Sequence, residues 1–269
     1  MDLNNLTVRT ITGFVFVVVI IGSILLSTYS FFIVFLAIVT GSLLEFYKLA
    51  AAANISPQKY PGTICGILFF IISYLVANQF IGTVFLLLLI PLLFVIPVPE
   101  LFRKQTQPFS NIAWTIFGII YIAVPFSLLN FINFQFPSGG LIIGYFIILW
   151  SYDTAAYLAG ISFGRHRLFE RVSPKKSWEG AIGGAILTTG VAYIVSLFFT
   201  VITFQQWLVV TLIIIVMGTF GDLAESLFKR SIDIKDSGNL FPGHGGFLDR
   251  FDAVLLSSPF VFSYLQFIR

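Results

Sequence analysis

Acidic and basic side chains recur at helical spacing between Asp222 and Arg230. Asp222, Glu225, Ser226, Lys229 and Arg230 fall at positions i, i+3, i+4, i+7 and i+8, so they share one helical face. A long apolar run precedes Asp222, and an ionised carboxylate in a bilayer helix is costly unless it faces a partner or a wet cavity. The face can therefore bind cations and phosphates, or it can be a stripe of interfacial salt bridges.

A second chemical segment, Phe241–Asp252, reads FPGHGGFLDRFD. Its three glycines permit tight turns and a close approach of backbone N–H groups to an anion. His244 can donate to a phosphate, or it can be a solvated turn residue. Asp249 and Asp252 follow at the expected start of a helix, where carboxylates also offset the helix dipole.

These acidic side chains predict a metal site between two helices. Mg²⁺ in proteins is held by one or two carboxylates together with substrate phosphates and water. We expect Asp222 and Asp249 to bind Mg²⁺, with Asp252 and Glu225 at or beside the ion. A second cation at this site is left open.

A third segment, Ser173–Gly180, reads SPKKSWEG. Ser before Pro favours a helix start, so we expect Ser173 as N-cap and Lys175 and Lys176 in the first turn. Backbone donors and the helix dipole favour anions there, and two ammonium groups would complete a phosphate cradle. The alternative is a pair of cations that anchors the chain to lipid headgroups.

Asp153 lies inside another apolar stretch and is hard to explain by packing. It can bind metal or sugar hydroxyls, or pair with a buried lysine. By contrast, the pairs Gly160/Gly164 and Gly180/Gly184 have the spacing typical of close helix packing in membranes.

The elements that must position these residues are apolar helices. Of the 269 residues, 58% are hydrophobic and only 10% charged, and the mean hydropathy is +0.97. This composition excludes an ordinary soluble domain and predicts an all-α polytopic integral membrane protein. About 20 apolar residues span a bilayer, and we expect about nine such helices: Ile11–Ser27, Phe31–Leu49, Thr63–Asn78, Ile81–Val98, Ile112–Phe134, Leu141–Phe163, Gly180–Val201, Trp207–Phe228 and Ala253–Ile268.

The connections between these helices differ sharply in charge. With nine spans, fourteen of the fifteen Lys and Arg residues lie on one side, and only Arg269 lies on the other. The positive-inside rule makes the rich side cytoplasmic, which places the N-terminus inside.

Two long cytoplasmic loops, 164–179 and 229–252, hold the candidate chemistry. We therefore expect an N-terminal scaffold, residues 1–135, and a C-terminal catalytic region, residues 136–269.

The quoted residues resemble a known family, the CDP-diacylglycerol synthases or phosphatidate cytidylyltransferases. Their C-terminal motif is matched by SLFKR from Ser226, by Lys235-Asp236 and by PGHGGFLDRFD from Pro242. The blocks WSYDTAAY from Trp150 and SPKKSWEG from Ser173 are similar to upstream motifs of the family. One departure is Ser177, where threonine is expected about as often.

The resemblance implies that CTP and phosphatidate give CDP-diacylglycerol and pyrophosphate, with Mg²⁺, in an oligomeric enzyme of the cell membrane. We expect a homodimer that contacts membrane lipids and no nucleic acid. Asp222, Asp249, Lys229, Arg230 and His244 would be catalytic. Substrate would contact the residues Lys175, Lys176, Ser173, Asp153, Ser226 and Arg250.

Two other functions fit some of the same residues. A CTP-dependent lipid-alcohol kinase would also join CTP to a membrane lipid. An ion-coupled transporter would use Asp153 and Asp222 as relay carboxylates, although its site should lie near the midplane and open to both sides. Asp222 lies near the inner end of its helix, and the outer side has almost no charge, which disfavours transport.

Overall fold

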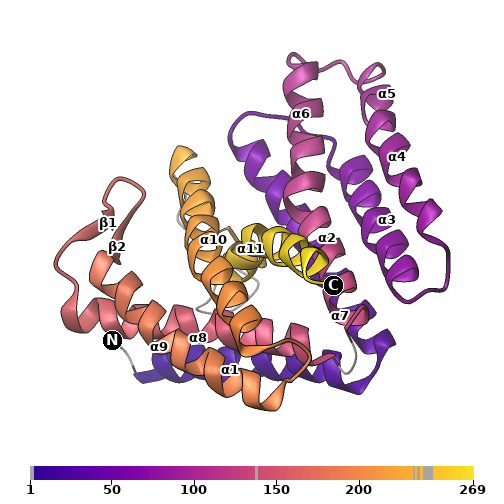
Figure 1. Ribbon diagram of the computed structural model, residues 1–269. Coiled ribbons are helices and arrows are strands. Elements are labelled where there is room, and N and C mark those ends of the chain that lie inside the picture. The colour runs from indigo at the N-terminus through magenta and orange to yellow at the C-terminus, as the bar shows by residue number, and fades with distance from the viewer. Residues whose placement is uncertain (1–2, 137–138, 233, 235–236, 239–244) are drawn as a thin grey trace. The chain divides into compact units, whose positions relative to one another are not determined.

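The computed structural model describes residues 3–136, 139–232, 234, 237–238 and 245–269. The described chain is almost entirely helical (Figure 1). It divides into two compact units. The first unit comprises residues 1–134 and 232–251, and the second comprises residues 135–231 and 252–269.

The first unit is a bundle of helices that run back and forth. Figure 1 shows α3, α4 and α6 side by side in it. Its helical elements are α1 (Leu3–Leu26), α2 (Thr28–Ala52), α3 (Lys59–Ala77), η1 (Thr83–Leu88), α4 (Leu89–Val95), α5 (Pro97–Glu100), α6 (Pro108–Gly118), the π-helical turn η2 (Ile119–Ala123) and α7 (Val124–Phe134).

Local sequence explains where α2 begins. Ser27 and Ser30 form a reciprocal capping box, in which each hydroxyl accepts the other residue's backbone N–H at 3.0 Å. Behind this cap the core is aromatic. Phe31 stacks on Phe35 with ring centroids 4.2 Å apart, and Phe126 meets Phe35 edge-on.

A buried polar network ties together the connections at one end of this bundle. Glu100 is 4% exposed, and it accepts from Gln58 Nε2, Asn111 Nδ2 and Arg103 Nη1, each at 2.8 Å. Arg103 also donates to Ser56 O at 2.9 Å. Because burial of an unpaired carboxylate is expensive, these donors make Glu100 a stable anchor for the two connections.

The second unit is built on two closely packed helices, α8 (Gly140–Phe163) and α9 (Trp178–Phe198). A Cβ on Gly184 would lie 2.8 Å from Ala156 Cβ, and one on Gly180 would lie 3.1 Å from Gly160 Cα. Small residues therefore let the two backbones touch, which confirms the predicted packing role of these glycines.

Two further helices complete the second unit. Helix α10 spans Phe204–Ser231, and α11 spans Leu248–Phe267, of which residues 252 onward belong to this unit. Tyr145 on α8 and Ser257 on α11 share a hydrogen bond of 2.6 Å.

A short β-hairpin connects α8 to α9, where we expected a helix start (Figure 1). Strand β1 (Arg167–Phe169) pairs antiparallel with β2 (Ser173–Ser177). The prediction of Ser173 as N-cap is therefore wrong. Helix α9 begins four residues later, where Ser177 Oγ accepts from Gly180 N at 3.1 Å.

Length and hydropathy identify seven helices of the described chain that can cross a membrane. They are Thr28–Ala52, Lys59–Ala77, Thr83–Glu100, Pro108–Phe134, Gly140–Phe163, Trp178–Phe198 and Phe204–Ser231. The expected all-α polytopic membrane fold is confirmed. The first and last of the nine expected spans form α1 and α11, which are not among the seven, so the number nine stays a prediction.

Candidate active site

The acidic and basic side chains near the end of α10 pair one turn apart. Ser226 Oγ donates to Asp222 Oδ1 at 3.2 Å, and Lys229 Nζ donates to Glu225 Oε2 at 2.9 Å. The Glu225 side chain is 3% exposed and that of Lys229 is 12% exposed, whereas Arg230 is exposed. The expected face of α10 is thus present, and part of it forms the i,i+4 pairs of a salt-bridge stripe.

A lysine from the β-hairpin joins this face. Lys176 Nζ lies 2.5 Å from Asp222 Oδ2, with side chains 29% and 38% exposed. Lys176 is half-buried on β2, whereas its neighbour Lys175 is exposed. The expected position of these two lysines at a helix N-terminus is wrong, because both lie on β2. Their binding of phosphate stays a prediction.

Tyr152 and Thr219 hold the two helices together beside this ion pair. Their hydroxyl groups share a hydrogen bond of 2.8 Å between α8 and α10, and Tyr152 lies in the electrostatic field of Lys176, Asp153 and Asp222. Neither hydroxyl was among the expected site residues. The sequence signal that could have identified Tyr152 as a site residue is its position directly before Asp153.

Asp252 adds a further carboxyl group to this place. It interacts electrostatically with Asp222, Glu225 and Asp153, in that order of strength, and its Oδ1 accepts the N–H of Ala253 at 2.7 Å. Four carboxylates from α8, α10 and α11 thus gather in the second unit. We name Asp153, Asp222, Glu225 and Asp252, with the cations Lys176 and Lys229, the acidic cluster.

The acidic cluster contains more carboxyl groups than cations. Its four carboxyl groups outnumber its two ammonium groups. No group of three or more His, Cys, Asp and Glu side chains close enough to hold a metal occurs among the described residues. Mg²⁺ needs only one or two carboxylates when phosphate and water complete its coordination, so the cluster fits a site that a nucleotide completes.

Asp249 belongs to the first unit, in the first turn of α11. Its Oδ2 accepts from Ser237 N, Ser237 Oγ and Gly246 N, each at 2.9 Å. Donors from both sides of the glycine-rich segment therefore fix this carboxylate. Its pairing with Asp222 around Mg²⁺ stays a prediction.

The remaining expected residues have different surroundings. Asp153 is on an exposed part of α8, and Arg250 is half-buried. Arg250 Nε is buried without a hydrogen-bond partner among the described residues, which suits a group that awaits an anion. Ser173 starts β2 and is half-buried. His244 lies outside the described residues.

Glu179 fixes the base of the hairpin. It accepts from the backbone N–H of Arg165 at 3.0 Å and of His166 at 3.1 Å, and it shares a hydrogen bond with His166 Nδ1. Trp178 N also donates to His166 O at 2.9 Å. These bonds hold the hairpin that presents Lys176, a role that the sequence pattern did not assign to Glu179.

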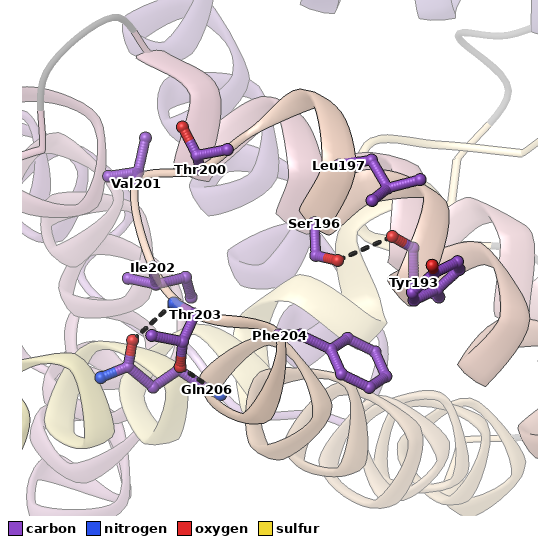
Figure 2. A pocket seen from close by; sticks show the side chains of 9 residues that line it. All are labelled: Tyr193, Ser196, Leu197, Thr200, Val201, Ile202, Thr203, Phe204 and Gln206. Atoms are coloured by element: carbon purple, nitrogen blue, oxygen red, sulfur yellow. Dashed lines mark hydrogen bonds between the residues drawn. The ribbon is translucent and has the colours of Figure 1, made fainter.

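Two of the depressions on the described surface lie in the second unit. One, about 740 Å³, is lined by Arg165, His166, Arg167, Glu170, Trp178, Glu179 and Ile182. The other, about 420 Å³, lies between the end of α9 and the start of α10, with Leu197 and Phe204 in its lining (Figure 2). Only the first carries cationic side chains suited to phosphates, and it adjoins the hairpin.

Comparison with known proteins agrees with this chemistry. A family model described as "Cytidylyltransferase family" matches residues 7–268. A "Phosphatidate cytidylyltransferase" of Staphylococcus saprophyticus is 32% identical over 94% of this chain and 96% of its own length. One of Rickettsia bellii is 34% identical over 71% of this chain and 84% of its own length.

The match extends through the helices of both units, and it includes the hairpin, α10 and the start of α11. Phosphoryl chemistry on a nucleotide needs both cations and carboxylates at one place, as the acidic cluster provides. The chain is an integral membrane protein that belongs to the cytidylyltransferase family.

Proposed function

We propose that the chain transfers the cytidylyl group of CTP to phosphatidate and so makes CDP-diacylglycerol and pyrophosphate. The observation that carries the proposal is the acidic cluster, in a chain of the cytidylyltransferase family. In this cluster Lys176 pairs with Asp222, and carboxyl groups of α8 and α10 act on Asp252. The name of the relatives, phosphatidate cytidylyltransferase, indicates that the lipid substrate is phosphatidate.

The reaction needs positioning and charge neutralisation more than proton transfer. A phosphate oxygen of phosphatidate attacks the α-phosphorus of CTP, and the bond from that phosphorus to the oxygen shared with the β-phosphate breaks. Pyrophosphate leaves with the bonding electrons. Because the attacking oxygen is already anionic, the site needs no strong general base.

The side chains divide this task by charge. Lys175, Lys176, Lys229, Arg230 and His244 neutralise oxygens of the triphosphate and of the leaving pyrophosphate, as expected from the sequence, and Arg250 contacts the substrate. The Lys176 ammonium group can leave the Asp222 carboxylate and pair with a phosphate oxygen instead. The length of its own side chain is enough for this movement. Ser226 keeps the Asp222 carboxylate oriented through their hydrogen bond.

Asp222 and Asp249 would hold Mg²⁺, with Asp252 and Glu225 beside them. When bound, the ion supplies Lewis-acid neutralisation of the phosphate oxygens around the reacting phosphorus. Carboxyl oxygens are the ligands that Mg²⁺ prefers in proteins, which supports this assignment.

The charge distribution also supports a location and an orientation. The enzyme lies in the cytoplasmic membrane, with its N-terminus inside and its site at the inner surface, because the connections on that side carry almost all the cations. The acyl chains of phosphatidate stay in the bilayer and enter between helices. We expect a homodimer, and no contact with nucleic acid.

The test uses the purified full chain with CTP, phosphatidate micelles and Mg²⁺. Formation of CDP-diacylglycerol with one pyrophosphate is the expected result, and Asp249→Asn, shown to be folded by its thermal unfolding, should lose at least ~100-fold in kcat. Near wild-type turnover of this variant would refute the metal assignment. CDP release with a lipid alcohol, without pyrophosphate, would instead identify a kinase.

A further inference from the structure

Glu45 is an acidic residue inside the apolar helix α2, and it contacts the segment that carries Asp249. Its Oε2 accepts from the backbone N–H of Leu248 at 3.1 Å and from Ser237 Oγ at 3.3 Å. Leu248 is the first residue of α11, so a carboxylate from the second helix of the chain caps the last one. All these residues belong to the first unit.

Small residues bring the two segments this close. A Cβ on Gly246 would overlap both carboxylate oxygens of Glu45, and one on Gly238 would lie 2.6 Å from Oε1. One turn before Glu45 on α2, Gly41 accommodates the ring of Phe247 in the same way. The face of α2 formed by Gly41 and Glu45 therefore receives the start of α11 as a shape-matched contact.

Ser237 links Glu45 to Asp249. Its hydroxyl lies 2.9 Å from Asp249 Oδ2 and 3.3 Å from Glu45 Oε2, and its backbone N–H also donates to Asp249. Gly246 N donates to the same oxygen of Asp249. The donors that orient Asp249 are thus the residues that Glu45 contacts.

We propose that Glu45 is a positioning residue for the reaction: it fixes Ser237 and the start of α11 on α2, and thereby fixes the direction of the Asp249 carboxylate. The inference rests on the proposed function, in which Asp249 holds Mg²⁺. It assigns a role in that site to the N-terminal half of the chain, whose helices carry none of the motifs discussed above. Glu45 acts through its hydrogen-bond geometry, and its charge is secondary.

The experiment compares Glu45→Ala with Glu45→Gln in the purified full chain. Both bonds go to one oxygen, so the single carbonyl oxygen of glutamine can accept them, whereas alanine accepts neither. We expect Glu45→Ala to raise the Mg²⁺ concentration for half-maximal activity about 10–100-fold, with a smaller loss of kcat at saturating Mg²⁺. Glu45→Gln should stay close to wild type.

A binding readout accompanies the kinetics. The Mg²⁺ concentration that gives half of the maximal rise in Tm, measured with CTP present, should shift in parallel for Glu45→Ala. Lys48→Gln, an exposed site on the same helix, is the matched control and should leave both values unchanged. If Glu45→Ala does not fold, Ser237→Ala provides the test instead. It removes the hydroxyl that Glu45 and Asp249 share, so it should shift the Mg²⁺ dependence in the same direction.

Two outcomes overturn the inference. One is an unchanged Mg²⁺ dependence in both Glu45→Ala and Ser237→Ala. The other is a loss in Glu45→Gln as large as in Glu45→Ala, which would make the charge itself essential. Failure of the proposed function is separate, because the wild-type chain would then form no CDP-diacylglycerol.

Discussion

Lys176 on β2 and Asp222 on α10 form an ion pair of 2.5 Å, whereas the neighbouring Lys175 is exposed on the same strand. Two lysines that are adjacent in sequence therefore have different surroundings. Of the two, it is Lys176 that pairs with a carboxylate of the acidic cluster.

Lys176→Ala should raise the KM for CTP about 10–100-fold, because removal of a cation next to a carboxylate leaves local charge unbalanced and removes a phosphate ligand. Lys175→Ala should raise it much less. Steady-state kinetics of both variants with phosphatidate micelles provide the measurement. Equal losses would show that the pair acts as one diffuse positive patch.

Gly246→Ala tests the fit between Glu45 and the start of α11. The added methyl group would overlap the Glu45 carboxylate, so the single variant should lose about 10–100-fold in activity at low Mg²⁺. In a Glu45→Ala background, Gly246→Ala should lower the activity little further, because the side chain that the methyl group would overlap is absent. A full additive loss in the double variant, measured as a double-mutant cycle, would argue against this contact.

Gly184 and Gly190 offer a matched test of the α8–α9 contact. A Cβ on Gly184 meets Ala156 at 2.8 Å, whereas one on Gly190 of the same helix meets nothing within 4 Å. Gly184→Ala should lower stability by about 1–3 kcal/mol through overpacking. Gly190→Ala should leave Tm unchanged or raise it. Thermal unfolding in detergent micelles checks both, and a similar Tm for the two variants would contradict the packing described.

Glu179→Ala should loosen the hairpin. The variant loses the acceptor for the N–H groups of Arg165 and His166, so local opening becomes easier. Trypsin should cleave after Arg165 or Arg167 several-fold faster than in the wild type, which gel analysis can follow. Glu170→Ala, an exposed acidic site on the same hairpin, is the control and should be cleaved at the wild-type rate.

Much of the fold follows from sequence patterns that act locally. Apolar length predicted helices at each expected span, and small-residue spacing predicted the contact of Gly180 and Gly184 with α8. The spacing of charges from Asp222 to Lys229 predicted the pairs that α10 makes. Such features depend only on residues within a few turns of each other.

The sequence-based predictions were wrong where contacts between residues far apart in the sequence determine the local structure. Ser173-Pro174 and Ser177 both suit a helix start, and the pairing of β2 with β1 selects Ser177. No local rule indicates that pairing.

Glu45 contacts residues 192 and 203 positions away, so no motif contains both partners. One signal was nevertheless available, since an acid inside an apolar helix predicts a partner or a function, as it did for Asp222.

The distance along the chain between Glu45 and Leu248 has a consequence for biogenesis. Ribosomes make α2 early, and the N–H group that caps against Glu45 is made 203 residues later. Until then this carboxylate has to remain near water or bind a temporary donor, because an isolated charge in lipid is expensive. Nascent chains that stop before Ser237 would lack both the Ser237 hydroxyl and the Leu248 N–H, which donate to the Glu45 carboxylate.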